Sequence, residues 1–154
     1  MRDRLFINVG YRDSLLKECD EKNILGFHML EAKDIFLLAA ALGLNEPRDI
    51  GGKKDGYFRT SYIKTVDKAL IASILLGKEE NQEKVDTYAN PDINYDEAER
   101  CAESGFIKLK AMIDSADGDM ELFEKRILSQ LNLLYQKNVA TNLWFKKLLS
   151  LLYW

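Results

Sequence analysis

The chain has 154 residues and a net charge of −3, and a domain of this length can fold around its own core without metals or disulfides. Its hydrophobic content of 47% and charged content of 31% are typical of a globular protein and exclude a disordered chain. The negative charge disfavours bulk nucleic-acid binding, in which cations neutralise phosphates, but it is compatible with a local basic patch. The sequence has no apolar run long enough for a transmembrane helix and no signal-peptide pattern, so we expect a cytoplasmic protein without a membrane partner.

The N-terminal part predicts a short strand followed by a helix. Residues 5–9 form a short apolar run that suits an edge strand. Asp13 or Ser14 is placed to cap a helix that carries apolar residues as far as Cys19. Residues 23–26 indicate a break after this helix.

The clearest helix is predicted over residues 32–42. Glu31 and Asp34 lie near its start, where acids complement the positive end of the helix dipole. Residues 35–42 are apolar on every side, which is typical of a fully buried helix, so we place the centre of the core here. Gly43 follows the last apolar residue, and we expect it to end the helix in the left-handed conformation.

The middle of the chain predicts a loop, a strand and a helix. Residues 45–56 are polar and rich in glycine, which indicates a loop. Residues 57–63 are aromatic and β-branched, and they predict a short strand that pairs with the N-terminal one. Thr65 is then placed to cap a helix over residues 66–76.

The acidic stretch 78–103 leads into another helix. Residues 90–92, Asn-Pro-Asp, predict a turn. Asn94 with Glu97 resembles a capping box at the start of the helix that follows. This helix carries a stripe of small residues that includes Gly105. Because glycine costs about 1 kcal/mol relative to alanine inside a helix, its place on the stripe predicts a close helix crossing.

Another break at residues 117–119 precedes the last two predicted helices. Asp119 is placed to cap a helix whose apolar residues recur at helical spacing: Phe123, Ile127, Leu131 and Leu134. Residues 142–154 are strongly apolar and predict a C-terminal helix. Together the elements predict an all-α, bundle-like single domain over residues 1–154, with about six helices and one short two-stranded β pairing.

The residues that could carry catalysis or bind a metal lack the partners they would need. His28 is the only histidine and has no triad partner at a recognisable spacing. Cys19 and Cys101 form no C-x-x-C pair, so we expect reduced thiols in or near the core and no zinc. The stretch 51–54 lacks the spacing of a phosphate-binding loop, and the acids at 114–121 lack that of a calcium loop. We therefore expect neither enzyme activity nor a cofactor, and a small nuclease would need acids that converge on magnesium in the fold.

A basic loop is the first candidate binding site. Its candidate nucleic-acid-binding residues are Arg48, Lys53, Lys54 and Arg59, and Lys64 continues the basic stretch. The aromatic residues Tyr57, Phe58 and Tyr62 are interleaved with these cations. Cations beside aromatic rings can bind phosphates and stack on bases. The alternative is a solvated loop whose aromatic rings turn into the core.

The C-terminal segment is the second candidate site. Its candidate interface residues are Leu143, Trp144, Phe145, Leu148, Leu152 and Trp154. A helix this apolar would expose a larger patch than a monomer normally tolerates, so it would close the core, form a homodimer, receive a partner or lie on a membrane. Core closure is the commonest of these outcomes, and a homodimer ranks second because Trp and Tyr are favoured interface anchors. A membrane-surface helix ranks last, since its polar face is usually broader and more cationic.

Three segments carry a resemblance to a known family. Asp34-Ile35-Phe36-Leu37-Leu38-Ala39-Ala40-Ala41-Leu42-Gly43 matches a D-x-F-x-x-A-A-x-x-G pattern, and residues 67–74 and 102–109 match a later helix and a small-residue segment. Over residues 3–130 the chain resembles the Dnd system-associated protein 4 family, whose members are encoded beside DNA phosphorothioation genes. The resemblance implies an accessory protein of a DNA modification or restriction system and supplies no catalytic residue. The apolar C-terminus departs from the family pattern, which puts the oligomeric state and the partner surface in doubt.

Two functional hypotheses follow. The first is a non-enzymatic adaptor of a phosphorothioation-linked modification, restriction or phage-defence system. Its partners would be other proteins of that system, with DNA as a further candidate and a homodimer through the C-terminal helix. The alternative is a small nucleic-acid-binding module that uses the basic loop 48–64.

Overall fold

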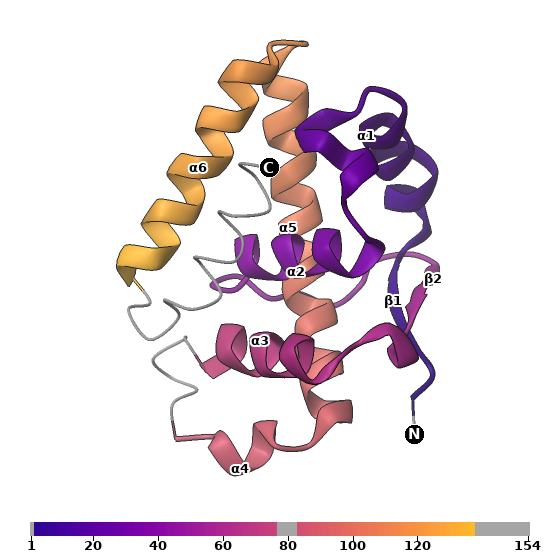
Figure 1. Cartoon of the computed structure of the whole chain (residues 1–154), viewed down its shortest axis with the longest axis vertical. Helices are drawn as coiled ribbons and strands as arrows, with labels where there is room; N and C mark the ends of the chain where they lie inside the picture. Colours follow the sequence, from indigo (N-terminus) through magenta and orange to yellow (C-terminus); the bar gives the residue numbers. More distant parts are fainter. Residues whose placement is uncertain (1, 77–82, 138–154) are drawn as a thin grey trace.

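The computed structural model describes residues 2–76 and 83–137, which form mostly helices and one two-stranded sheet at the side of the molecule (Figure 1). In chain order the elements are strand β1 (Arg4–Asn8), π-helical turn η1 (Tyr11–Leu16), helix α1 (Lys17–Glu21), 3₁₀ segment η2 (Ile24–Met29), α2 (Ala32–Leu42), β2 (Lys54–Arg59), 3₁₀ turn η3 (Thr60–Tyr62), α3 (Thr65–Leu76), α4 (Val85–Tyr88), α5 (Pro91–Ala116) and α6 (Met120–Lys137). This arrangement confirms the mainly α-helical fold with one two-stranded pairing. The predicted helix over 142–154 lies outside the described residues.

Helix α2 has the bounds that the sequence predicts and forms the centre of the core with α5. Its first turn is fixed by the Glu31 backbone N–H, which donates to Asp34 Oδ2 at 3.2 Å. Every residue from 35 to 42 is buried. Figure 1 shows α5 running through the length of the molecule, with α2 and α3 lying across it and α6 beside it. The core is therefore built around one long helix.

The crossing of α2 and α5 depends on two glycines. A Cβ atom at Gly105 would lie 1.6 Å from the backbone oxygen of Ala39, and one at Gly43 would lie 1.9 Å from that of Cys101. Only residues without a side chain allow the two backbones to come this close, so the close crossing predicted from Gly105 is confirmed. The left-handed conformation predicted for Gly43 is wrong, because its φ is −97° and its ψ is 5°. Glycine is needed there for space.

The two strands pair antiparallel, as predicted, but β2 begins and ends earlier than the predicted strand 57–63. Its register places Arg4 opposite Arg59 and Asn8 opposite Lys54, with an irregularity between Leu5 and Phe6. After Arg59 the chain turns into η3, because the Thr60 N–H donates to Asp3 O at 2.9 Å and closes the ladder. Residues 60–62 therefore form a turn instead of continuing the strand.

The first helical segment starts earlier than predicted. Val9 and Gly10 are already helical, and neither Asp13 nor Ser14 caps the segment. The turn from strand to helix is made by Asn8, whose side-chain oxygen accepts the Gly10 N–H at 2.8 Å. The predicted break that follows is confirmed by two left-handed residues, Asn23 at φ 47° and Gly26 at φ 63°.

Helix α5 also starts earlier than predicted, at Pro91. Asn90 is its N-cap, and its side chain accepts the Asp92 N–H at 3.0 Å, so residues 90–92 are the start of the helix and not a separate turn. The capping box predicted at Asn94 is wrong, because Asn94 is buried within α5 and its side chain donates to Tyr88 O. For α6 the prediction holds: Asp119 accepts the Leu122 N–H at 3.0 Å. The predicted apolar stripe of α6, from Phe123 to Leu134, is buried.

Candidate functional site

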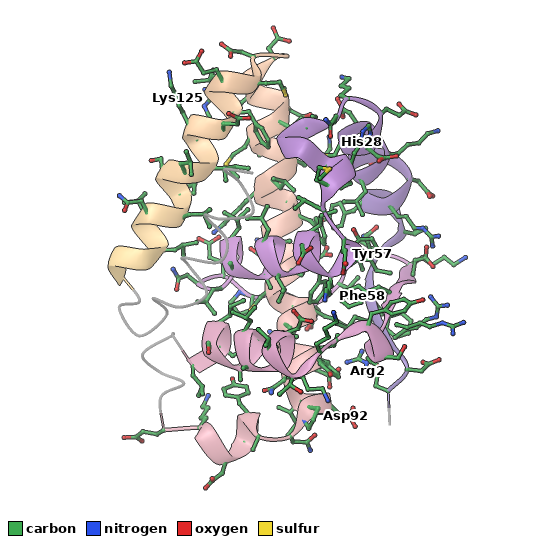
Figure 2. The ribbon with its side chains drawn as sticks, in the orientation of Figure 1. Arg2, His28, Tyr57, Phe58, Asp92 and Lys125 are labelled. Carbon is green, nitrogen blue, oxygen red and sulfur yellow. The ribbon has the colours of Figure 1, made fainter. Side chains whose placement is uncertain are left out.

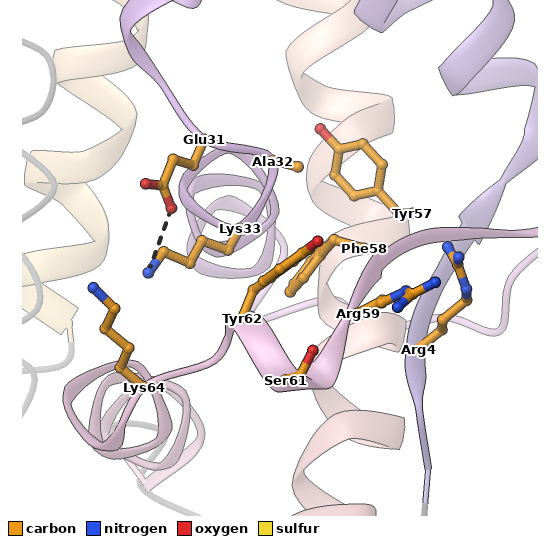
Figure 3. Close-up of a pocket in the computed structure, with 10 residues that line it drawn as sticks. All are labelled: Arg4, Glu31, Ala32, Lys33, Tyr57, Phe58, Arg59, Ser61, Tyr62 and Lys64. Carbon is orange, nitrogen blue, oxygen red and sulfur yellow. Dashed lines mark ion pairs between the residues drawn. The ribbon is translucent and has the colours of Figure 1, made fainter.

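A groove of about 740 Å³ lies between the first turn of α2 and the end of β2 with η3 (Figure 3). We call it the basic groove. Its lining residues are Arg4, Glu31, Ala32, Lys33, Tyr57, Phe58, Arg59, Ser61, Tyr62 and Lys64. Four of these side chains are cationic and one is acidic, although the whole chain has a net charge of −3. The positive charge is therefore concentrated locally.

The cations of the basic groove fall into two groups. Lys33 is engaged, because its Nζ lies 2.9 Å from Asp67 Oδ2 and 3.5 Å from Glu31 Oε2. The hydrogen bond to Asp67, despite desolvation, holds the pKa of Lys33 above its usual value. Among the described residues, Arg4, Arg59 and Lys64 have no ion-pair partner. Three positive charges are thus left to attract an anion from outside.

Arg4 and Arg59 occupy directly opposed positions on β1 and β2. Residues opposed in this way have Cβ atoms about 4.5–5.5 Å apart, and like charges placed so are destabilising. Gly56 gives Arg4 the room it needs, because a Cβ atom at Gly56 would lie 2.8 Å from Arg4 Cδ. The fold thus holds two guanidinium groups on one side of the groove (Figure 3).

The three aromatic residues of the predicted basic loop all line the groove, but they differ in exposure. Phe58 is buried and packs edge-on against Phe36 with ring centroids 5.6 Å apart. Tyr57 is half-buried, and burial raises the pKa of its hydroxyl. Tyr62 is 62% exposed. The loop therefore anchors two rings and exposes the third to solvent, so the prediction of inward-turned rings holds for Phe58 and not for Tyr62.

Tyr62 is held by the backbone of η3. The Thr60 hydroxyl donates to Arg2 O at 2.8 Å, and the Ile63 N–H donates to Thr60 O at 3.0 Å. Ile63 follows the turn and is buried. Because one end of this short turn is hydrogen-bonded to the N-terminal segment and the other end is buried, the backbone that carries the exposed ring is held at both ends.

The four residues predicted to bind nucleic acid do not share one surface. Arg59 lines the basic groove, whereas Lys54 lines a separate depression of about 270 Å³ that also contains Asp96 and Glu99. Arg48 is exposed in the loop between α2 and β2, and its backbone N–H donates to Arg100 O at 3.1 Å. Lys53 is exposed just before β2. The structure thus brings Arg59 together with Lys64 and the aromatic residues, and it leaves the other three outside the groove.

Arg4 and Lys33 are groove residues that sequence reasoning missed. Alternation with the buried Leu5 and Ile7 could have placed Arg4 on the outer face of its strand. Its position opposite Arg59 depends on the register of the sheet, which no local pattern specifies. Lys33 lies in the first turn of the most apolar helix, where it is easily taken for a solvated residue.

Two buried carboxylates of α5 hold the N-terminal strand and the following loop. Glu99 is 4% exposed; it accepts Arg2 Nη2 at 2.9 Å and the Phe6 N–H at 2.7 Å. Glu103 is 5% exposed and accepts the Tyr11 hydroxyl at 3.2 Å and the Gly51 N–H at 3.4 Å. Burial raises the pKa of both carboxyl groups above the usual value, and these hydrogen bonds partly oppose the shift. Both side chains have structural partners that account for their position.

The residues first considered for catalysis or metal binding differ in exposure. His28 is exposed, and its ring nitrogen contacts the backbone oxygen of Asp20. Cys19 and Cys101 are buried, as predicted, and burial raises the pKa of the Cys19 thiol to about 12. Within residues 2–76 and 83–137, no group of three or more His, Cys, Asp or Glu side chains is arranged to hold a metal ion.

The acidic run near the end of α5 has local explanations. Asp114 pairs with Lys110 at 2.9 Å and Glu121 pairs with Lys125 at 2.6 Å. The other two acids, Asp117 and Asp119, lie at the end of α5 and at the start of α6. Across the described ranges, no helix is long and apolar enough to cross a membrane. The candidate interface residues at 143–154 lie outside these ranges.

Comparison with known proteins gives no further guide to the function. No protein-family model, curated protein or solved structure matches this chain. The basic groove is therefore the feature from which a function must be argued.

Proposed function

We propose that this protein is a non-enzymatic accessory protein that binds nucleic acid in the basic groove. The observation that supports this proposal most is the gathering of Arg4, Arg59 and Lys64, without ion-pair partners in the described part of the chain, around the exposed Tyr62. Unpaired like charges raise the free energy of the folded state, and an anionic ligand relieves this repulsion. Cations with an aromatic ring between them match a phosphate backbone that carries bases.

The proposed binding is local and electrostatic. Among the described residues, Glu31 is the one acid that lines the groove, and it is paired with Lys33 at 3.5 Å, so the lining has an excess of positive charge. The acids that make the chain negative overall lie elsewhere, for example in the run that ends α5. Each cation that neutralises a phosphate releases a counterion. Binding is therefore expected to weaken steeply with salt.

The test measures binding of fluorescent oligonucleotides by anisotropy over a range of salt concentrations. We expect Arg59→Glu to weaken binding at low salt and to reduce the slope of log affinity against log salt by about 1 or more, as for the loss of a phosphate contact. Lys125→Glu is the matched control, because it makes the same change of charge on α6, away from the groove (Figure 2). The proposal is wrong if neither single-stranded nor duplex oligonucleotides bind, or if both variants weaken binding equally.

For the biological setting we propose a cytoplasmic DNA modification or restriction system linked to phosphorothioation. This setting is supported by the resemblance of residues 34–43, 67–74 and 102–109 to the Dnd system-associated protein 4 family. It is compatible with a groove that binds nucleic acid. A test is to delete the gene in its native host and to measure phosphorothioate content and restriction of unmodified DNA. An unchanged phenotype in both assays would contradict this setting.

An adaptor role through protein–protein interaction is the second candidate function. The observation that favours it is the apolar segment 143–154, whose Trp144, Phe145 and Trp154 are residue types that anchor interfaces. We expect a tagged protein to recover modification or restriction proteins from the native host even after nuclease treatment. Recovery that disappears with nuclease would instead favour nucleic-acid binding in the basic groove.

A homodimer through this segment would dissociate on replacement of Trp144 and Phe145 by serine, as judged by light scattering.

A further inference from the structure

The side chains that line the basic groove indicate which kind of nucleic acid it binds. This inference rests on the function proposed above. We propose that the groove binds single-stranded nucleic acid, with a phosphate between Arg4 and Arg59 and a base against the ring of Tyr62. Three features support the proposal: the opposed arginines, the exposed ring on a held backbone, and the order of the cations and the ring along the groove.

The opposed arginines form a site for one phosphate. Arg4 and Arg59 face each other across the two strands, and neither has an acidic partner among residues 2–76 and 83–137. Guanidinium groups donate in a planar fork that matches a phosphate in two-pronged geometry. A phosphate that bridges the pair turns a repulsive cross-strand contact into two attractive ones. Gly56 is part of this arrangement, since a side chain there would displace Arg4.

The ring of Tyr62 is suited to stack on an unpaired base. It is 62% exposed, whereas Phe58 in the same loop is buried. The backbone that carries it is fixed by the hydrogen bonds of Thr60 to Arg2 and Asp3. Because the backbone of η3 is already ordered, binding loses less conformational entropy than it would in a mobile loop. Every base has a face that can stack on such a ring, so this contact requires no particular sequence.

The order of side chains along the groove suits a single strand. Figure 3 shows Tyr62 in the middle, with Arg4 and Arg59 on the sheet side and Lys33 and Lys64 on the side of α2 and α3. A single-stranded nucleic acid that passes over the Tyr62 ring can therefore place its phosphates near cations on both sides of a stacked base. In a duplex the bases are stacked inside and present only their edges in the grooves. A duplex could reach these cations but could not use the ring.

The deciding experiment compares single-stranded and duplex oligonucleotides of about 20 nucleotides, longer than one typical binding site. We expect the wild type to bind the single strand more tightly. We expect Tyr62→Ala to weaken single-strand binding about tenfold and to leave duplex binding unchanged, because stacking on one ring is lost. Tyr62→Trp keeps a stacking surface, and we expect it to retain wild-type affinity. Thermal unfolding of each variant provides the folding control, and the exposure of Tyr62 predicts little change.

The outcomes separate this proposal from the one on which it rests. Equal binding of single strand and duplex, or a Tyr62→Ala variant that binds single strands like the wild type while Arg59→Glu does not, would overturn the single-strand proposal alone. Nucleic acid would then still bind through the cations. Failure of both oligonucleotides to bind the wild type would overturn both proposals. A loss of single-strand binding in Tyr62→Ala that Tyr62→Trp restores supports the stacking role directly.

Discussion

The two ends of α2 take part in regions of opposite character. Near its C-terminal end the backbone of Ala39 lies against Gly105 of α5 so closely that a Cβ atom at that glycine would be 1.6 Å from the Ala39 oxygen. At its first turn, Lys33 lines the basic groove with three cations that have no ion-pair partner in the described ranges. Close packing of the two backbones characterises the first region, and an excess of positive charge characterises the second.

The two regions have opposite effects on the stability of the unliganded chain. At the crossing, small residues let the two helix backbones pack closely against each other, and this close packing favours the folded chain. In the groove the opposed pair Arg4 and Arg59 disfavours the folded chain unless an anion is present. A cluster that opposes folding by itself is typical of a functional site. Substitutions should therefore change stability at one end of α2 and binding at the other.

The largest effect is expected at the crossing. Gly105→Ala places a carbon atom against the Ala39 backbone, which cannot move as a flexible side chain could. The helices must separate, so we expect the free energy of unfolding to fall by about 3 kcal/mol or more, at or above the usual range for overpacking. The higher helix propensity of alanine, worth about 1 kcal/mol, offsets only part of this loss. Urea denaturation followed by circular dichroism measures the change.

Gly51→Ala is the control for the same chemical change. A Cβ atom at Gly51 would meet only Glu103 Oε1, at an ordinary contact distance of 3.9 Å. We expect a change within about 1 kcal/mol in either direction, mainly through the entropy of the unfolded chain. Equal stability losses at Gly51 and Gly105 would contradict the view that backbone contact determines the crossing.

The second largest effect is expected at Asp67, a buried acid beside the groove and an exception to this division. Asp67 is 3% exposed and accepts both Lys33 Nζ and the Lys64 N–H at 2.9 Å. Asp67→Asn leaves the poorly exposed Lys33 charge with only Glu31 as an acidic partner, at 3.5 Å. We expect a loss of about 3 kcal/mol in unfolding free energy, since removing one partner of a buried ion pair leaves the other charge uncompensated.

Glu31→Gln is the matched control, because it removes the exposed partner of the same lysine. The Glu31 side chain is 71% exposed, and surface pairs contribute about 0–1 kcal/mol. The unfolding free energy of this variant is expected to stay within that margin of the wild type. If both variants lose the same stability, the burial of Asp67 has no energetic role.

Sequence reasoning succeeded where a local pattern determines the structure and failed where the register or a distant partner does. The bounds of α2, the crossing at Gly105 and the cap at Asp119 follow from apolar periodicity, small residues and capping chemistry. The start of α5 was missed because Asn90 and Asn94 both resemble caps, and only tertiary packing buries the second.

The basic groove was predicted only in part for the same reason. Arg59 and the aromatic residues are close together in sequence, so a local pattern found them. Arg4 joins them only through the pairing of β1 with β2, and Lys33 only through the position of α2. Arg48 and Arg59 are close in the sequence, but in the fold only Arg59 lines the groove.

A smaller effect on stability, but a clear one on binding, is expected at Gly56. A Cβ atom there would lie 2.8 Å from Arg4 Cδ, which belongs to a flexible side chain and can move. Gly56→Ala should therefore change the unfolding free energy by less than about 1 kcal/mol, in the range of ordinary surface substitutions. Single-strand affinity should fall several-fold, because Arg4 no longer faces Arg59. Wild-type affinity in this variant would contradict the phosphate site between the two arginines.

The smallest effect is expected at Glu103, where a buried carboxylate holds the loop beyond the groove. Burial raises the pKa of Glu103 above 4.5, the value for an exposed side chain, while Gly51, Tyr11 and Arg48 oppose the shift. The folded chain then binds more protons than the unfolded chain between these two pKa values, so this residue contributes more stability as the pH falls through that window.

Glu103→Gln has no such proton to bind. It should be at least as stable as the wild type at neutral pH and lose that advantage toward pH 4.5. Glu99 titrates in both proteins and cancels in the difference. A stability difference that stays constant over this range would mean that ionised Glu103 is fully compensated by its partners, and that this loop is held by charge as well as by shape.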